Sequence, residues 1–351
     1  MPTEEKARAL ARVETIANLS PIEGADRIEK ARILGWDVVV KKGEFKIGDK
    51  CVYFEIDSIL PKTEWSNFLS DKNNPQKAIR LKTIRLRKQL SQGLALPINF
   101  VFPNEDNFEV GEDVTTKLNI IKYEAPIPAS LKGEIQGYFP SFLYKTDEER
   151  IQNIFPIISQ INGKLMYISV KMDGTSSTYF YNPSIENSFG VCGRNIWYKP
   201  TVENTYWKIA KKYDIENKLK KYYEKYGQKI AIQGEICGPS IQSNKIGLKD
   251  HELFVFNIFD IDKKQFYNYL NFISICKELE LQTVPILNDN YVFTGHETIE
   301  ELLKMAEGVY INGHTREGIV IRPLIEEYSE LLKGRLSFKI INNNFLEETG
   351  E

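Results

Sequence analysis

The chain has 351 residues, of which 42% are hydrophobic and 27% charged, and its formal net charge is −2. This composition is typical of a globular protein with two domains, and four scattered cysteines with three histidines make a zinc site unexpected. No apolar run approaches the ~18 residues that span a bilayer, so we expect an intracellular protein, cytoplasmic or nuclear, without membrane association.

The N-terminal part is predicted to be β-rich, because its apolar residues alternate and glycines separate the segments. Short strands with little helix favour a small barrel. Lys117–Gly137 has no periodic pattern and contains two prolines, which predicts a linker. The predicted strands are Ala9–Ile16, Arg27–Leu34, Asp37–Lys41, Lys50–Glu55, Ala78–Leu86 and Gly93–Pro97.

The rest of the chain mixes strands and helices in an α+β pattern. Thr146 with Glu149 and Thr298 with Glu301 form potential capping boxes. The predicted helices run from Thr146 to about Gln160, over Glu203–Tyr226 and Gln265–Glu280, and from Thr298 to about Glu307. The predicted strands are Lys164–Val170, Ser176–Tyr181, Gly190–Arg194, Lys229–Ile236, Leu253–Ile261, Glu317–Arg322 and Leu336–Ile341.

The segment Val170–Ser176, with the sequence VKMDGTS, carries the clearest chemical signal. It places Lys171 where a predicted strand turns, with a carboxylate two residues later and a glycine after that. A lysine in this position can act as a nucleophile. The K-x-D-G pattern alone is also explained by a polar turn, so its meaning depends on the segments that follow.

Lys171 would need a specific environment to react. A free lysine has a pKa near ~10.4, so well under ~0.1% of it is a neutral amine at pH 7. Lowering that pKa to near neutrality takes roughly 4 kcal/mol. Burial and a nearby cation can both contribute, and a divalent metal would also polarise a phosphate. Such a metal binds oxygen ligands, directly or through water.

Three carboxylates occupy suitable positions for this chemistry. Asp173 follows the lysine, Glu235 lies between glycines at a predicted strand end, and Glu317 opens another predicted strand. Each acid alone is more simply explained as a solvated side chain. The repeated combination of a strand-end acid and a glycine nevertheless indicates a site.

Two basic residues could complete a phosphate-binding site. Arg194 lies in the segment GRN, where the alternative is a surface ion pair. Lys339 lies in the segment LSFKII and faces inward if its apolar neighbours flank the core. A buried lysine is costly unless it is paired or functional.

Taken in order, these segments resemble the motifs of the lysine nucleotidyltransferases, the class of polynucleotide ligases and mRNA capping enzymes. The similarity covers most of residues 164–345. The matching segments are KMDG (171–174), CGRN (192–195), QGEI (233–236), FVFNIFDI (254–261), REGIVIR (316–322) and SFKII (337–341).

The order of the domains narrows this resemblance. DNA ligases and capping enzymes carry an OB barrel after the catalytic domain, and DNA ligases usually have an arginine where this chain has Ser176. Here the β-rich block comes first, and the sequence ends soon after Lys339, with no room for a later barrel. The chain therefore resembles the fifth family of ATP-dependent RNA ligases, as does its segment GEICGPSIQSN (234–244).

The resemblance implies an α+β protein of two domains. Residues 1–122 would form an N-terminal OB-fold β-barrel that binds nucleic acid. Residues 123–351 would form an adenylyltransferase (ATP-grasp-like ligase) domain of antiparallel sheets and helices.

The chain departs from the family at Ile341, where several RNA ligases have a second lysine, and Arg335 or Lys245 could supply that phosphate contact.

The resemblance also implies the catalytic roles. Lys171 would attack the α-phosphate of ATP and become lysyl-AMP. Asp173 and Glu317 would contact Mg²⁺ or Mn²⁺ through water, and Glu317 would also contact the nucleotide. Glu235 would contact the ribose hydroxyl.

The remaining ATP and AMP contacts follow from the same resemblance. The Val170 backbone would meet the adenine edge, and Phe256 would stack on the adenine ring, although core packing explains Phe256 equally well. Arg194 and Lys339 would contact phosphates.

A basic segment in the N-terminal part, residues 77–88, is a candidate RNA-binding strip. Arg80 and Lys82 share one face of the predicted strand, as do Arg85 and Arg87. A bulge near Thr83 would bring both pairs to the same face. The alternative is a solvated edge strand protected by charge.

The implied activity is ATP-dependent RNA ligation. A monomer would join RNA 3′-hydroxyl and 5′-phosphate ends through lysyl-AMP and RNA-adenylate, sealing nicks in duplexes during RNA repair.

One alternative is a DNA ligase, which would seal a nick whose 3′-hydroxyl strand is wholly DNA. Another is a capping-type guanylyltransferase, which GTP would label. The third is a non-catalytic RNA-binding protein with a decayed site, although the retained site residues argue against decay.

Overall fold

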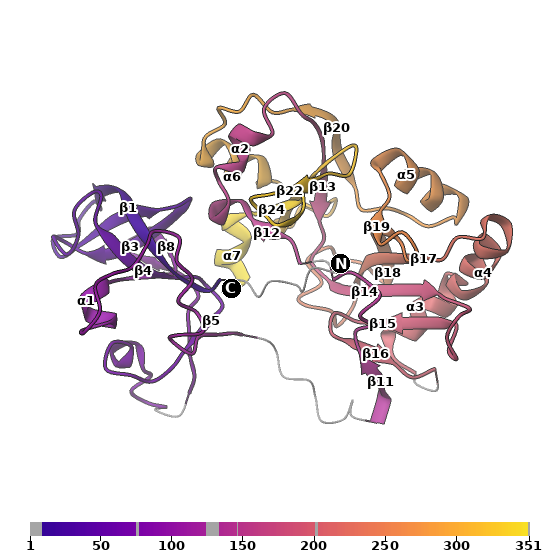
Figure 1. Ribbon diagram of the computed structural model, residues 1–351, viewed down its shortest axis with the longest axis horizontal. Coiled ribbons are helices and arrows are strands. Elements are labelled where there is room, and N and C mark those ends of the chain that lie inside the picture. Colours follow the sequence, from indigo (N-terminus) through magenta and orange to yellow (C-terminus); the bar gives the residue numbers. More distant parts are fainter. Residues whose placement is uncertain (1–8, 75–76, 124–132, 146, 201–202, 350–351) are drawn as a thin grey trace. The chain divides into compact units, whose positions relative to one another are not determined.

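The computed structural model describes residues 9–74, 77–123, 133–145, 147–200 and 203–349. Its internal contacts divide the chain into two units, residues 1–126 with 346–351, and residues 127–345 (Figure 1). None of the helices within the described ranges has the length and apolar character needed to cross a membrane. The predicted domain boundary after residue 122 stays a prediction.

The first unit is a curled OB-fold half-barrel. One sheet has the order β3-β2-β1-β4-β9, a second the order β10-β5-β6, and β7 pairs with β8 as a hairpin. A short helix, α1 (Ile98–Val101), follows the last strand of the first sheet. The strands are β1 (Ala11–Pro21), β2 (Ile28–Ile33), β3 (Trp36–Lys41), β4 (Lys50–Phe54), β5 (Ser58–Leu60), β6 (Ile79–Arg80), β7 (Thr83–Leu86), β8 (Gln89–Gln92), β9 (Leu94–Pro97) and β10 (Ile121–Lys122).

Alternating burial explains why these residues form a half-barrel. In β3, Trp36, Val38 and Val40 are buried while the residues between them are partly exposed, which is the period-2 pattern of a strand with one face on the core. On β4 the four residues after Lys50 are apolar and buried, and they divide between two separate cores, with Val52 in one and Tyr53 in the other.

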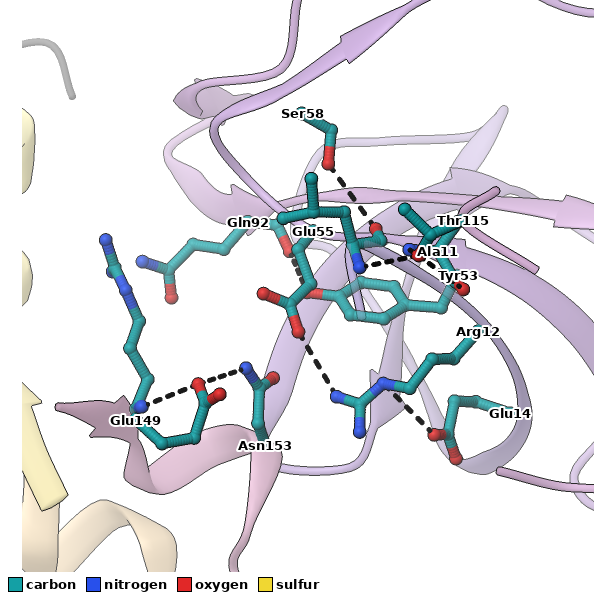
Figure 2. Close-up of polar contacts among 12 residues, drawn as sticks. Ala11, Arg12, Glu14, Tyr53, Glu55, Ser58, Gln92, Thr115, Glu149 and Asn153 are labelled. Atoms are coloured by element: carbon teal, nitrogen blue, oxygen red, sulfur yellow. Dashed lines mark hydrogen bonds and ion pairs between the residues drawn. The ribbon is translucent and has the colours of Figure 1, made fainter. Parts of the chain in front are cut away.

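A buried polar cluster ties the first strand to the end of β4 (Figure 2). The Arg12 guanidinium donates to Glu55 at 3.2 Å and lies 3.8 Å from Glu14. Burial raises the pKa of Glu14, and Arg12 partly offsets that effect. The Thr115 hydroxyl accepts hydrogen bonds from the backbone N–H groups of Leu10 and Ala11. These contacts fix β1, on which both neighbouring strands depend.

Two predictions for this unit are wrong. The strand predicted over Ala78–Leu86 is two strands, β6 and β7, in different sheets, so the bulge that would align its four basic residues does not exist. The linker predicted over Lys117–Gly137 is structured at its ends, where β10 pairs with β5 and Ile135–Tyr138 forms β11. Residues 124–132 of that linker lie outside the described residues.

The second unit contains two main sheets. The larger has the order β11-β16-β15-β14-β17-β18-β19, and the smaller the order β12-β24-β21-β13-β20. Among the strands that the structure describes in this unit, pairing is antiparallel except between β12 and β24. The strands are β11 (Ile135–Tyr138), β12 (Glu149–Arg150), β13 (Leu165–Lys171), β14 (Thr175–Tyr181), β15 (Phe189–Cys192), β16 (Ile196–Tyr198), β17 (Ile230–Cys237), β18 (Glu252–Asp260), β19 (Gln265–Phe266), β20 (Ile286–Val292), β21 (Gly318–Pro323), β22 (Tyr328–Ser329), β23 (Gly334–Arg335) and β24 (Phe338–Ile341).

Helices cover the sheets of this unit. Residues of α3, α4 and α5 pack with the larger sheet in one core, and residues of α2 and α6 pack with the smaller sheet in another. The capping box predicted at Thr298 and Glu301 is confirmed at the start of α6. The helices are α2 (Ile157–Gln160), α3 (Thr205–Lys212), α4 (Ile215–Tyr226), α5 (Tyr269–Glu278) and α6 (Ile299–Ala306). The last helix, α7 (Asn343–Thr349), begins in this unit and ends in the first one.

Three helix predictions need correction. The helix predicted to begin at Thr146 falls partly on an undescribed residue, and its described part is β12, a 3₁₀ turn and the short α2, because Pro156 cannot continue a helix. The helix predicted over Glu203–Tyr226 is broken at Asp214, which has φ 51°. The helix predicted over Gln265–Glu280 begins only at Tyr269, after the strand β19.

A buried arginine joins the two sheets of the second unit. Arg322 on β21 donates to Ser337 Oγ at 3.0 Å, to the Phe256 carbonyl of β18 at 3.3 Å and to Glu148 Oε1 at 2.7 Å. Burial alone would raise the pKa of Glu148, yet Arg322 and Arg335 hold it below its ordinary value. The guanidinium therefore holds β18 of the larger sheet beside β21 of the smaller one.

Replacing this guanidinium should destabilise the second unit strongly. We expect Arg322→Met to lower the free energy of unfolding by about 3–5 kcal/mol, because it leaves the buried Glu148 carboxylate without the charged partner that donates to it. Urea unfolding followed by tryptophan fluorescence measures the change. Lys229→Met, which breaks a surface ion pair with Asp262, is the control and should cost less than about 1 kcal/mol. Equal effects of the two substitutions would contradict the assignment.

Candidate active site

The fold brings Lys171 to the place where the two sheets of the second unit meet. Met166 to Val170 of β13 are all buried, and Lys171 is the last residue of that strand, with 26% of its side chain exposed. Its neighbours Val170 and Met172 pack with Cys237 of the larger sheet in a small apolar cluster. The lysine therefore stands at the edge of an apolar surface.

Two glycines allow the backbone to close around Lys171. A Cβ on Gly174 would lie 2.4 Å from the Ile236 carbonyl oxygen of β17. One on Gly318, which pairs with Lys171 across the β13–β21 ladder and has φ 155°, would lie 2.2 Å from the Ile340 carbonyl oxygen. The glycines that accompany the acids in the sequence thus permit close approach of neighbouring strands.

The three predicted carboxylates converge on this lysine. Lys171 Nζ lies 2.7 Å from Glu317 Oε1, and Glu317 directly precedes β21. Asp173 is buried in the turn after Lys171. Glu235 lies on β17 opposite Ser176 of β14 and interacts electrostatically with the other three groups.

The carboxylates control the charge state of the site. Burial lowers the pKa of Lys171, but Glu317, Glu235 and Asp173 outweigh that effect and raise it above its ordinary value. Burial, reinforced by the other two acids, raises the pKa of Glu235 to about 8. The protein alone therefore holds the amine as an ammonium ion and keeps Glu235 largely protonated at neutral pH.

The donor set suits a hard divalent cation. Carboxylate oxygens are the ligands that Mg²⁺ and Mn²⁺ prefer, and an excess of carboxylates around one ammonium favours an added positive charge. Among the residues that the structure describes, no three His, Cys, Asp or Glu side chains converge closely enough to hold a metal ion directly. The carboxylates therefore fit a divalent ion that they would hold largely through water molecules.

The predicted phosphate-binding residues lie in different settings. Arg194 makes a surface ion pair with Asp147, at 2.8 and 2.9 Å to its two oxygens, and each side chain is about half exposed (51% and 50%). This is the alternative that the sequence left open for Arg194. Lys339 lies on β24 opposite Val320, and it is half-buried between buried neighbours.

The predicted adenine contacts lie along the same apolar cluster. Phe256 on β18 is partly buried and packs against the cluster that contains Val170. The Val170 N–H donates to the Pro285 carbonyl at 2.9 Å, so that donor is already engaged.

The structure separates the four basic residues predicted to bind RNA. Arg80 on β6 donates to Asp57 Oδ1 at 2.6 Å, and its guanidinium carbon lies 3.7 Å from the centre of the Tyr123 ring. Because these contacts already engage the Arg80 guanidinium, it is a poorer candidate for phosphate contact than an exposed basic residue. Lys82 is exposed between β6 and β7.

The β7–β8 hairpin presents the other basic residues. Arg85 is exposed and donates to Glu347 Oε2 at 2.8 Å. Arg87 and Lys88 form the two-residue turn with φ 52° and 66°. Such turns favour Asn-Gly, so two long basic side chains here occupy a strained backbone of the kind found at functional sites.

Tyr310 was not among the predicted site residues. Its hydroxyl contacts the backbone on both sides of Met172 and at Glu317. No local pattern around Tyr310 indicates this, because its contacts with Lys171 and Asp173 join residues more than a hundred positions apart.

Comparisons with known proteins agree with this geometry. A family model described as RNA ligase matches residues 164–341, and one described as an OB-fold domain matches residues 10–98. A search of curated proteins gave no match. The two matches place an OB-fold domain before an RNA ligase domain in one chain.

Solved structures of Naegleria gruberi RNA ligase resemble the whole chain. The complex with PPi is 39% identical with TM-score 0.85, and the match covers 97% of this chain and 99% of that one. A lysine variant with ATP and Mn is 39% identical with TM-score 0.84, covering 97% and 98%. Another lysine variant, with AMP and Mn, is 39% identical with TM-score 0.85, covering 97% and 99%. The chain belongs to the RNA ligase family.

The raised pKa of Glu235 predicts a specific pH dependence of stability. The folded-state pKa of about 8 lies above the ordinary 4.5, so the stability that the protonated carboxyl provides is lost as the pH rises from 4.5 through 8. Glu235→Gln removes this loss, which we estimate at about 1–3 kcal/mol. The melting temperature of Glu235→Gln minus that of the wild type should rise by about 3–8 °C between pH 5 and pH 9.

Differential scanning fluorimetry in EDTA measures this difference without metal. Glu203→Gln, at an exposed glutamate of the same unit, is the control and should give a constant difference. A Glu235→Gln difference that is equally flat with pH would contradict the raised pKa.

Proposed function

We propose that this protein is an ATP-dependent RNA ligase that joins 3′-hydroxyl to 5′-phosphate ends through lysyl-AMP and RNA-adenylate intermediates. The observation that carries the proposal is the Lys171 amine, 2.7 Å from Glu317 and surrounded by Asp173 and Glu235, in a chain of the RNA ligase family. The PPi, ATP and AMP named for the Naegleria gruberi RNA ligase structures are the product, substrate and transferred group of such a first step.

In the first step the Lys171 amine attacks the α-phosphorus of ATP. A bond forms between Nζ and phosphorus, the bond to the bridging oxygen breaks, and pyrophosphate leaves with that electron pair. The Glu317 carboxylate is within hydrogen-bond distance of the ammonium proton that must first be lost. A divalent cation held by Asp173 and Glu317 through water would supply positive charge that offsets the carboxylates and the phosphates.

Other residues would orient the nucleotide. Glu235, protonated at neutral pH, can both donate to and accept from a ribose hydroxyl. Phe256, in the apolar cluster beside Val170, would stack on adenine. Lys339 would contact a phosphate, and Arg194 would do so after releasing Asp147.

The later steps use the RNA itself. An oxygen of the RNA 5′-phosphate attacks the α-phosphorus and releases the Lys171 amine, giving RNA-adenylate. The 3′-hydroxyl of the second end then attacks the 5′-phosphate, and AMP leaves. We assign this activity to the sealing of nicks in RNA duplexes by a monomeric, intracellular protein, with residues 1–122 as the RNA-binding OB domain and residues 123–351 as the catalytic domain.

Removing the Lys171 amine should abolish covalent labelling. Wild-type protein incubated with α-labelled ATP and Mg²⁺ or Mn²⁺ is expected to carry label through denaturing electrophoresis, and Lys171→Ala is expected to carry none. Lys229→Ala, at a surface lysine paired with Asp262, should label like the wild type. Labelled Lys171→Ala would refute the assignment, and labelling of the wild type by GTP alone would favour a guanylyltransferase.

The basic hairpin should bind RNA without taking part in the first step. We expect Arg85→Gln/Arg87→Gln to raise the Kd for nicked duplex RNA about 3–10-fold and to flatten the slope of log Kd against log salt by about 1–2, because two phosphate contacts are lost. Fluorescence anisotropy at several salt concentrations measures both.

The control for this variant is Lys46→Gln/Lys117→Gln, which removes two exposed lysines from other loops of the same unit. It should leave the slope unchanged, and both double variants should still form lysyl-AMP. An unchanged salt slope for Arg85→Gln/Arg87→Gln would place the RNA elsewhere.

A further inference from the structure

A tight hairpin between α6 and β21 buries one tyrosine beneath the catalytic lysine. Val309 pairs with Thr315, the Tyr310 N–H donates to the His314 carbonyl at 2.8 Å, and Gly313 adopts φ 86° to complete the turn. The side chains on either side of Tyr310 face solvent, Val309 being 60% and Ile311 104% exposed, whereas Tyr310 is 7% exposed. The hairpin therefore directs a single ring inward.

The hydroxyl of this ring has all its hydrogen-bonding capacity in use. It accepts from the Asp173 N–H at 3.0 Å and from the Glu317 N–H at 3.2 Å, and it donates to the Lys171 carbonyl at 3.2 Å. A phenolic hydroxyl offers one donor and two acceptor positions, so these three bonds saturate it. Burial raises the pKa of Tyr310, so the hydroxyl keeps its proton at working pH.

These three bonds join the segments that carry the reacting groups. Lys171 and Asp173 belong to the turn after β13, and Glu317 belongs to the start of β21. The ladder between these strands ends at the pair Lys171 and Gly318, so beyond that pair ladder hydrogen bonds no longer fix the spacing of the two segments. The hydroxyl bridges them where the amine of Lys171 meets the carboxylate of Glu317.

We propose that Tyr310 is a positioning residue for RNA ligation, whose hydroxyl sets the separation of Lys171, Asp173 and Glu317 for attack on ATP. The inference rests on the proposed function. Tyr310 touches no reacting atom, and it acts through the backbone of the three residues that do. A displacement of about 1 Å in a reacting group can cost about a hundredfold in rate, so loss of this bridge should slow the chemical step.

The predicted signature is a change in rate without a matching change in ATP binding. Tyr310→Phe keeps the ring in its apolar cluster with Val170 and Met172 and removes only the hydroxyl. The rate of lysyl-AMP formation at saturating ATP should fall about 10–100-fold. The ATP concentration for half-maximal rate should change less than about threefold, because adenine and ribose contacts remain.

Tyr269→Phe is the matched control. Tyr269 lies in the same unit, is 8% exposed, and directs its hydroxyl to Asp289 at 3.3 Å. Rapid-quench measurement with α-labelled ATP and Mg²⁺ gives both parameters for the wild type and the two variants. Tyr269→Phe should stay within about twofold of the wild type in both. The melting temperature of each variant is measured in parallel, and if Tyr310→Phe melts near the assay temperature, all three proteins are compared at 10 °C.

The outcomes separate this inference from the proposed function. A wild-type protein that ATP does not label would overturn the proposed function itself. A wild type that is labelled, with Tyr310→Phe equal to it in rate, would overturn the role of Tyr310 alone. Equal rate losses in Tyr310→Phe and Tyr269→Phe, or a loss seen only as weaker ATP binding, would do the same, because they indicate general packing or binding rather than positioning.

Discussion

The catalytic unit is organised around one ammonium group among carboxylates at the edge of an apolar surface. Burial favours a neutral Lys171 amine, and the three neighbouring acids oppose it and prevail. The balance therefore favours the charged form of Lys171 in the protein alone. The same excess of carboxylates makes the site receptive to a divalent cation, whose positive charge would offset them.

The fold serves this arrangement by bringing two sheets together at their ends. Lys171 and Glu317 come from neighbouring strands of the smaller sheet, and Glu235 comes from the larger one. Gly174 and Gly318 permit the close approach of backbones that a side chain would prevent. Arg322 holds the sheets in register from within the core. The stability of the unit and the proposed active site therefore depend on the same junction between sheets.

The sequence predicts the local part of this site well and its long-range part poorly. The apolar run that ends at Lys171 and the acids beside glycines are short patterns, and the strands that hold them were predicted within a residue or two. The place of Tyr310 in the site could not be predicted, because it depends on hydrogen bonds that only the folded chain creates. For Arg194 the sequence shows the motif, but it does not show that the side chain pairs with Asp147.

The same reasoning explains the errors in the fold. The segment Ala78–Leu86 was predicted as one strand with a slip in phase near Thr83, yet the chain changes sheet at Leu81–Lys82, where neither glycine nor proline marks a break. The amphipathic pattern of residues 203–226 likewise persists through Asp214, which ends one helix and begins another. In both cases tertiary packing, rather than the local sequence pattern, determines where the element ends.

The protonation of the Lys171 amine tests the central claim most directly. Protein labelled with ¹³C-lysine, assigned with Lys171→Ala, can be titrated by NMR in EDTA and again with Mg²⁺ present. The carboxylate cluster predicts that in EDTA the Lys171 pKa lies above the ordinary ~10.4 and that Mg²⁺ lowers it. A Lys171 pKa already near neutrality in EDTA, unchanged by Mg²⁺, would show that burial alone activates the nucleophile and would contradict the account.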